Sequence, residues 1–185
     1  YLACKRHLED LKRKSFEYFF DREASEQHIS LANELIVGEG EEVKTLTTRG
    51  FQNFIIGSLF GWFLRETGER RFREAYIQIG RQNGKSFLGG AVANDMASFS
   101  GYRKGRIFCV ATKQDQANIV WEEIQKFIES DPDLKELYRI REHDRTIKSL
   151  VTGTVIKSLG RDTKSADGFR SILAIVDEYH AHPNN

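Results

Sequence analysis

The chain has 185 residues, of which 39% are hydrophobic and 30% are charged, and its formal net charge is +1. This length suits a single domain with a sizeable core, and the balance of charges excludes nucleic-acid binding through an overall positive field. No apolar run approaches the ~18–20 residues of a membrane helix, the start is no signal peptide, and Cys4 and Cys109 form no metal or disulfide pattern, so we expect a reduced intracellular protein.

The first third of the chain predicts helices. Residues 5–20 and 23–37 place apolar side chains on one face among charged ones, and an acidic loop follows at 38–47. Residues 49–64 predict a strongly apolar, buried helix. Because the chain starts at Tyr1 rather than Met and stops soon after its last predicted strand, we expect it to be part of a longer protein.

From Arg73 onwards the pattern becomes mixed. Extended spacing of apolar residues predicts a strand over 73–80, and small apolar residues predict a helix over 87–99. A continuous apolar run predicts a buried strand over 105–112. An amphipathic helix is expected over 114–130, ended by Asp131-Pro132.

Two short strands or a hairpin are expected over 146–160 around Thr152-Gly153, and a buried strand over 171–180 follows a polar loop. The order predicts an α/β fold in which helices flank a mostly parallel sheet. We expect a helical N-terminal region, 1–64, and an α/β core, 65–185.

The sequence GRQNGKS between the first predicted strand and helix resembles the end of a phosphate-binding loop. Gly84 would let the backbone approach phosphate, Lys85 would reach the β- and γ-phosphates, and Ser86 would hold Mg²⁺. The usual first glycine is replaced by Ile79. A second interpretation of the triplet alone is a turn, a solvated lysine and a helix cap.

Five apolar residues run into Asp177-Glu178 at the end of the last strand. A carboxylate there would lie beside the phosphate loop, with Asp177 on Mg²⁺ and Glu178 polarising the attacking water. Taken alone, the pair is better interpreted as two solvated acids at an exposed strand end. Both motifs together, in this order, predict an ATP-hydrolysing P-loop enzyme of the ASCE branch, which has extra strands between the two motifs.

Five segments, in this order, resemble the N-terminal ATPase region of a tailed-bacteriophage terminase large subunit, the motor that packages DNA. They are YLACKRHLEDL, FQNFIIGSLFGWF, RRFREAYIQIGRQNGKS, ATKQDQANIVWEEI and SADGFRSILAIVDEYHAH. The family's phosphate loop often lacks the first glycine and carries an arginine just before its variable positions; this arginine is Arg81 here. The resemblance implies a C-terminal nuclease domain in the full-length protein, which this sequence does not contain.

The resemblance also implies roles for single residues. Arg81 would act as an arginine finger on the γ-phosphate, and Gln52 would contact adenine, with Phe51 or Phe54 packing on the base. Surface roles for Arg81 and Gln52 remain alternatives. The implied catalytic residues are Glu178, Arg81 and Lys85; the implied nucleotide contacts are Gln52, Gly80, Arg81, Gln82, Asn83, Gly84, Lys85, Ser86 and Phe87; and the implied Mg²⁺ ligands are Ser86 and Asp177.

Other polar residues give weaker predictions. Thr112 and Gln116 are candidates for coupling to DNA, against the alternative of ordinary strand-end and helix-start residues. The loop with Arg161, Lys164 and Arg170 could act between subunits or on DNA, or could be a solvated loop. His180 and His182 lack a third metal ligand of suitable spacing.

The partners that the resemblance implies are double-stranded phage DNA, the portal protein and the small terminase subunit. Assembly in the host cytoplasm as a homo-oligomeric ring on the procapsid is expected, with a monomer for the fragment alone and no membrane contact. Two alternatives remain: another translocating or helicase-like P-loop ATPase, and a DNA-binding module with a vestigial nucleotide site.

Overall fold

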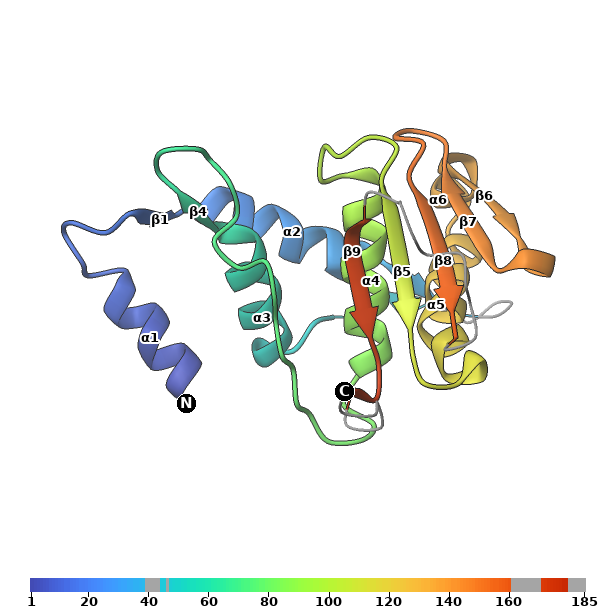
Figure 1. Ribbon diagram of the computed structural model, residues 1–185, viewed down its shortest axis with the longest axis horizontal. Helices are drawn as coiled ribbons and strands as arrows, with labels where there is room; N and C mark the ends of the chain where they lie inside the picture. Colours follow the sequence, from blue (N-terminus) through green and yellow to red (C-terminus); the bar gives the residue numbers. More distant parts are fainter. Residues whose placement is uncertain (39–43, 46, 161–170, 180–185) are drawn as a thin grey trace. The chain divides into compact units, whose positions relative to one another are not determined.

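The computed structural model describes residues 1–38, 44–45, 47–160 and 171–179. The chain divides into two compact units, which we describe separately (Figure 1). Unit 1 comprises Tyr1–Glu34 and Leu46–Gly80, and unit 2 comprises Leu35–Thr45 and Arg81–Asn185.

Unit 1 is mainly helical, as the sequence predicts. Its elements are α1 (Leu2–Asp10), β1 (Tyr18–Phe20), α2 (Arg22–Glu34), α3 (Gly50–Gly61) and β4 (Trp62–Leu64). Strands β1 and β4 pair antiparallel, with Phe19 opposite Phe63. Helices α2 and α3 approach closely because Gly57 faces Ser25, whose Oγ would lie 2.5 Å from an added Cβ.

Each predicted N-terminal helix is longer than the observed one. The helix expected over 5–20 ends at Asp10, because the aromatic residues 18–20 pair with β4 instead. The helix expected over 23–37 ends at Glu34, and Ile36–Val37 form β2, which pairs with β3 (Lys44–Thr45) in unit 2. Likewise, the last residues of the helix expected over 49–64 belong to β4.

A buried ion pair fixes α1 in unit 1. Arg71 lies 2.8 Å from Asp10 Oδ2, with side-chain exposures of 15% and 6%, and its guanidinium lies over the rings of Phe16, Tyr18, Trp62 and Phe72. Burial opposes ionisation of Asp10, but hydrogen bonds and charge from Arg71 and Arg13 hold its pKa below its usual value. Removing one partner would therefore leave a buried, uncompensated charge.

His7 is the second tie between α1 and the rest of unit 1. Trp62 Nε1 donates to His7 Nδ1 at 3.0 Å, and the imidazole packs edge-on against Phe20 and Phe54. Burial lowers the pKa of His7 from its ordinary value of 6.5; Asp10 raises it, and Arg6 and Arg71 add to the lowering. The neutral imidazole is therefore the form that the fold uses.

We expect acid to weaken unit 1 through His7. Because the folded pKa lies below the unfolded one, the unfolded chain binds more protons, so this stability is present above the unfolded pKa and is lost as the pH falls through the folded pKa. Urea unfolding at about pH 7.5 and about pH 5.5 should show a smaller loss for His7→Gln than for the unmodified chain. His143→Gln, at an exposed position, is the matched control and should leave the loss unchanged.

Unit 2 is an α/β structure around a five-stranded sheet. The strands are β5 (Arg106–Val110), β6 (Tyr138–Arg141), β7 (Thr146–Ser149), β8 (Val155–Leu159) and β9 (Ser171–Val176), in the order β6-β7-β8-β5-β9. The other elements are α4 (Lys85–Ser98), α5 (Gln114–Ser130), α6 (Pro132–Leu137) and the 3₁₀ helix η1 (Glu142–Asp144). Side by side, the strands form the larger sheet in Figure 1.

The sheet is mixed rather than mostly parallel. Strand β5 is parallel to β8 and β9, as expected for strands linked by helices, but β7 is antiparallel to β6 and β8. The reason is the short connections around β7: η1 joins it to β6, and a turn with Gly153 at φ 74° joins it to β8. The predicted hairpin around Thr152-Gly153 is therefore present, and it makes this part of the sheet antiparallel.

Helices α4 and α5 pack on one face of the sheet. Ile107, Cys109, Ile147 and Ile156 point into this core and are fully buried, and burial raises the pKa of the Cys109 thiol to about 12. A buried polar cluster crosses the same layer: Ser98 donates to Tyr138 Oη at 2.7 Å. The other face carries the alternate residues of each strand, so β5 is buried at every second position only.

Two predictions about strands are wrong. Residues 73–80, expected as a strand, form neither strand nor helix; β5 pairs instead with β8 and β9, which come from later parts of the chain. Strand β9, expected to be buried, has no fully buried residue, and Val176 is 43% exposed. Strand β9 is an edge strand of the described sheet, so its apolar residues have a neighbouring strand on one side only. No helix among the described residues is long and apolar enough to cross a membrane.

Candidate functional site

The loop before α4 has the backbone geometry of an anion-binding turn. Gly84 caps the helix in the left-handed conformation, φ 73° and ψ 34°, and Gln82 is also left-handed at φ 60°. Residues 81–85 are exposed, and Leu88 donates to the Gly84 carbonyl at 2.9 Å as the helix begins. A helix N-terminus with a glycine cap offers free backbone N–H groups and a favourable dipole to phosphate.

Close packing holds the start of α4 in place. A Cβ on Gly90 would lie 2.8 Å from the ring of Phe127 in α5, and one on Gly89 would lie 3.5 Å from Ile175 in β9. These glycines let the helix approach both α5 and the sheet. Consequently the exposed loop is attached to a rigid, buried support.

Lys85 brings the two sequence motifs together. Its Nζ lies 2.8 Å from Asp177 Oδ1 and 2.9 Å from Glu178 Oε1, although Lys85 and Glu178 are 93 residues apart. The hydrogen bond to Asp177 raises the pKa of Lys85; partial burial acts in the opposite direction, and Glu178 adds to the rise. Lysine is therefore held as a cation between two carboxylates.

The two acids follow β9 at the carboxyl edge of the sheet. Asp177 donates its N–H to the Val110 carbonyl of β5 at 2.8 Å, which extends the parallel ladder, and its carboxylate accepts from Glu178 N at 2.8 Å. Glu178 has φ 51°, a left-handed conformation that costs energy in a residue with a side chain. Asp177 is thus fixed and largely buried, while Glu178 is half-buried and turned by its backbone.

These residues fit a Mg²⁺–ATP complex by their chemistry. The donor set offers the Ser86 hydroxyl and the Asp177 carboxylate, which are the oxygen ligands that Mg²⁺ takes alongside phosphate and water. Gly84 and the loop N–H groups suit phosphate oxygens, and Lys85 supplies a mobile cation. The ion pairs of Lys85 would have to exchange, since the same Asp177 oxygen now faces Lys85 and the Glu178 N–H.

Other residues predicted in the loop lie in different environments. Arg81 is exposed, and no ion pair joins it to another described residue; its carbonyl accepts from the Asn83 side chain at 3.0 Å. Ser86 is half-buried in the first turn of α4. Phe87 is buried edge-on against Phe127, so only its backbone can face a ligand. Gly80 is the last residue of unit 1.

Gln52 belongs to unit 1 and is 5% exposed, which removes the alternative of an ordinary exposed helix residue. Its Oε1 accepts from Arg49 N at 2.8 Å, as the third residue of a capping box at the start of α3. The amide group keeps two N–H donors, so contact with adenine remains a prediction for this residue.

A polar cluster at the ends of β5 and β8 was missed by sequence reasoning. Gln114 donates to Ser158 at 2.6 Å and accepts from Gly160 N at 2.7 Å, and Ser158 donates to Asn118 at 2.5 Å. The signal is weak, because serine and amide residues in such positions are common. Thr112 donates to Gln116 at 3.2 Å, which matches the local strand-to-helix interpretation of these two residues.

Several predicted residues lie outside the described part of the chain: Arg161, Lys164, Arg170, His180 and His182. Among the residues that the structure describes, no three His, Cys, Asp or Glu side chains gather to hold a metal ion.

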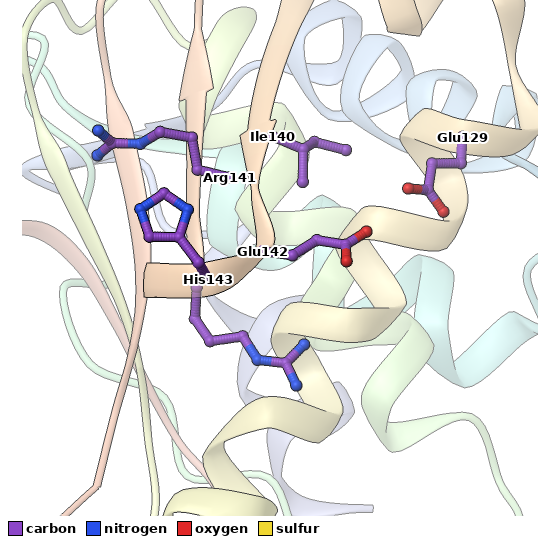
Figure 2. Close-up of a pocket in the computed structure, with 6 residues that line it drawn as sticks. Glu129, Ile140, Arg141, Glu142 and His143 are labelled. Atoms are coloured by element: carbon purple, nitrogen blue, oxygen red, sulfur yellow. The ribbon is translucent and has the colours of Figure 1, made fainter.

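A hollow of about 860 Å³ lies elsewhere in unit 2, between α5 and β6 (Figure 2). It is lined by Glu129, Ile140, Arg141, Glu142, His143 and Arg145. Most of its charged groups are already engaged: Gln125 donates to Glu129 and Glu142, and Arg145 lies 3.5 Å from Glu122. It contains none of the predicted nucleotide residues, so we place the candidate site at Lys85, Asp177 and Glu178.

Comparison with known proteins gives consistent matches. Residues 50–185 match the family model described as "Terminase large subunit, ATPase domain". The terminase large subunit of Enterobacteria phage HK97 is 28% identical over 105 residues, which are 56% of this chain and 21% of that protein. The crystal structure of the HK97 bacteriophage large terminase has a TM-score of 0.69 at 22% identity, covering 82% of this chain and 30% of that chain. The chain thus spans about a fifth to a third of these relatives.

Proposed function

Because the chain belongs to the terminase large-subunit ATPase-domain family, we propose that it is the ATP-hydrolysing part of a DNA-packaging motor, with a P-loop NTPase fold. Hydrolysis at the Lys85 site would power translocation of viral genomic DNA into a procapsid.

The contact of Lys85 with Asp177 and Glu178 carries this proposal. Residues from two distant motifs meet where a helix starts and a parallel strand ends. In α/β sheets this edge is where nucleotides bind, because helix N-termini and strand carboxyl ends converge there. A chance cluster would not also need a left-handed glycine cap beside it.

Each residue has a separate role in the proposed site. The loop Gly80–Phe87 binds the phosphates through its N–H groups, with Gln82, Asn83 and Gly84 at its tip, and Lys85 bonds the β- and γ-phosphate oxygens. Arg81 donates to the γ-phosphate and stabilises charge as the bond to it breaks. For Gln52, which belongs to unit 1, contact with adenine is proposed from the family alone.

Asp177 and Ser86 would hold Mg²⁺, which neutralises phosphate charge when bound. Glu178, released from Lys85, orients the attacking water and accepts its proton. Glu178 directly follows the proposed metal ligand Asp177 and has a left-handed backbone, so the two acids can serve different tasks.

The proposed partners follow from the family. They are double-stranded phage DNA, a portal protein and a small terminase subunit, met during phage assembly in the host cytoplasm. A homo-oligomeric ring would form on the procapsid. The longer protein would also cut DNA with a nuclease domain.

Thermal unfolding of the chain with and without MgATP tests the proposal. At about a hundred times the dissociation constant, MgATP should stabilise the folded chain by about 2.7 kcal/mol, or about 5–10 °C in Tm. EDTA should remove most of the shift, because the metal bridges protein and phosphate. An absent shift at saturating MgATP, with intact DNA binding, would instead favour a DNA-binding module with a vestigial nucleotide site.

A further inference from the structure

The sheet of unit 2 has a second face that helices α4 and α5 do not cover. In the register of the strands, Arg139 lies opposite Lys148, and Thr146 lies opposite both Arg141 and Lys157. Residues directly opposite share a face, and residues two apart in a strand share it too. Arg139, Arg141, Lys148 and Lys157 therefore lie on one face, which we call the basic sheet face.

This face is accessible and strongly positive. Arg139, Arg141 and Lys148 are exposed, and Lys157 is half-buried. The strand positions between them on the same face, Thr146 and Val155, are uncharged and buried, so the charged side chains form its accessible part. Figure 2 shows Arg141 extending away from the side on which Ile140 and Glu142 point towards α5. Arg106, level with Val155 on β5, extends the same face.

Acidic residues offset little of this charge. Within the described residues, Asp144 of η1 lies 2.9 Å from Arg141, and no other carboxylate forms an ion pair with the four residues. Glu142, which follows Arg141 in the sequence, points towards α5 and accepts from Gln125 at 3.0 Å. Three of the four cations therefore face solvent without a described counter-ion.

The pairing of Arg139 with Lys148 is unfavourable for the fold alone. Like charges directly opposite each other on neighbouring strands repel, and neutral or opposite-charge pairs would stabilise the sheet better. An anion between the two side chains would convert this repulsion into binding. The pair thus points to a ligand that is itself anionic and extended.

We propose that the basic sheet face binds the phosphate backbone of double-stranded DNA. By the register the cations form two rows about 6.7 Å apart along the strands: Arg139 and Lys148 are one strand spacing, about 4.8 Å, apart, and Arg141 and Lys157 are two spacings, about 9.6 Å, apart. Duplex DNA presents one charge per about 1.7 Å of its axis, so several phosphates can meet these rows together. Strands β6 and β7 present Arg139, Arg141, Thr146 and Lys148 on this face and no aromatic side chain, which favours backbone contact over the base stacking used on single strands.

Such binding would not depend on sequence. Lysine and arginine contacts to phosphate position a protein on the duplex without reading bases, as a motor that moves along DNA requires. In this respect the inference rests on the proposed function, since DNA is the proposed substrate. It adds a location on unit 2 that the net charge of +1 conceals.

The test uses the 185-residue chain and a fluorescein-labelled DNA duplex of arbitrary sequence. Anisotropy titrations over a series of salt concentrations should give weaker binding for Lys148→Gln/Lys157→Gln than for the unmodified chain. The slope of log affinity against log salt should fall by about 0.9 for each phosphate that the variant no longer neutralises. Adding Arg139→Gln to this double variant should reduce both the affinity and the slope further.

The matched control is Lys126→Gln/Lys135→Gln, which removes the same charge from exposed positions on α5 and α6. It should leave both affinity and slope close to those of the unmodified chain. Circular dichroism melting verifies that both double variants fold. Removing the Arg139–Lys148 repulsion should not lower the melting temperature.

Three results would overturn the proposal: equal affinity and slope for the Lys148/Lys157 variant and the unmodified chain, equal losses in the control, or no duplex binding at low salt. An acidic protein surface as the true occupant would give the first result. MgATP melting on the same preparations separates this inference from the proposed function. If MgATP gives no melting shift but DNA binding still depends on Lys148, only the proposed ATPase function is contradicted.

Discussion

Lys85→Ala should abolish the stabilisation of the chain by MgATP. The Lys85 side chain contacts both acids, and its Nζ is the cation proposed to bind the β- and γ-phosphates. Without it the phosphates lose a charged hydrogen-bond donor, and the loss of the whole ligand-linked stabilisation is about 2.7 kcal/mol under the conditions given above.

The comparison must be the shift, rather than the melting temperature itself. Alanine at 85 also leaves Asp177 and Glu178 adjacent without their cation, so the unliganded variant begins from a different stability. Lys126→Ala is a suitable control, since Lys126 is exposed on α5, and it should keep the full shift. An undiminished MgATP shift in Lys85→Ala would refute the assignment of the phosphate site.

Glu178→Gln should separate binding from hydrolysis. Glutamine keeps the size of the side chain and a carbonyl oxygen but cannot accept a proton from water. We expect the MgATP shift to persist while the rate of phosphate release falls by about 10²–10⁴-fold, the usual contribution of a general base.

Asp177→Asn provides the contrast. Asp177 is proposed to hold the metal, so this change should weaken both the Mg²⁺-dependent part of the shift and phosphate release. Phosphate release under single-turnover conditions, with nucleotide saturating, measures the rate without the contribution of binding. If Glu178→Gln hydrolyses ATP as fast as the unmodified chain, another residue activates the water.

Much of unit 2 could be predicted from sequence because its elements are specified locally. The amphipathic pattern of residues 114–130 and the following Asp131-Pro132 define α5, whose observed bounds are Gln114–Ser130. Asp131 caps the next helix by accepting from Asp133 N at 2.9 Å, a local rule of the same kind.

Strand environments could not be predicted in the same way. The apolar run before Asp177 indicates a strand, but burial depends on which elements lie beside it, and β9 is an edge of the described sheet. Residues 73–80 alternate as a strand does, yet alternation specifies faces and not a partner. Pairing partners are long-range information that a single sequence does not contain.

The candidate site shows the same division. The motif predicts a glycine at the end of the loop and a helix after it; Gly84 is left-handed in the structure, and α4 begins at Lys85, two residues before the predicted start. That Lys85 contacts both acids, and that Gln52 is buried, depend on how separate elements pack. The residue types predict the chemistry of the site, but they do not predict which side chains Lys85 and Gln52 contact.

The resting contacts of Lys85 also bear on product release. Two carboxylates lie 2.8 and 2.9 Å from the Lys85 ammonium group and act as its internal counter-ions. In the proposed ATPase, these acids would compete with the product phosphates for the same ammonium group, and each re-formed ion pair would favour departure of the products. Such competition would moderate the affinity for nucleotide in favour of repeated cycles.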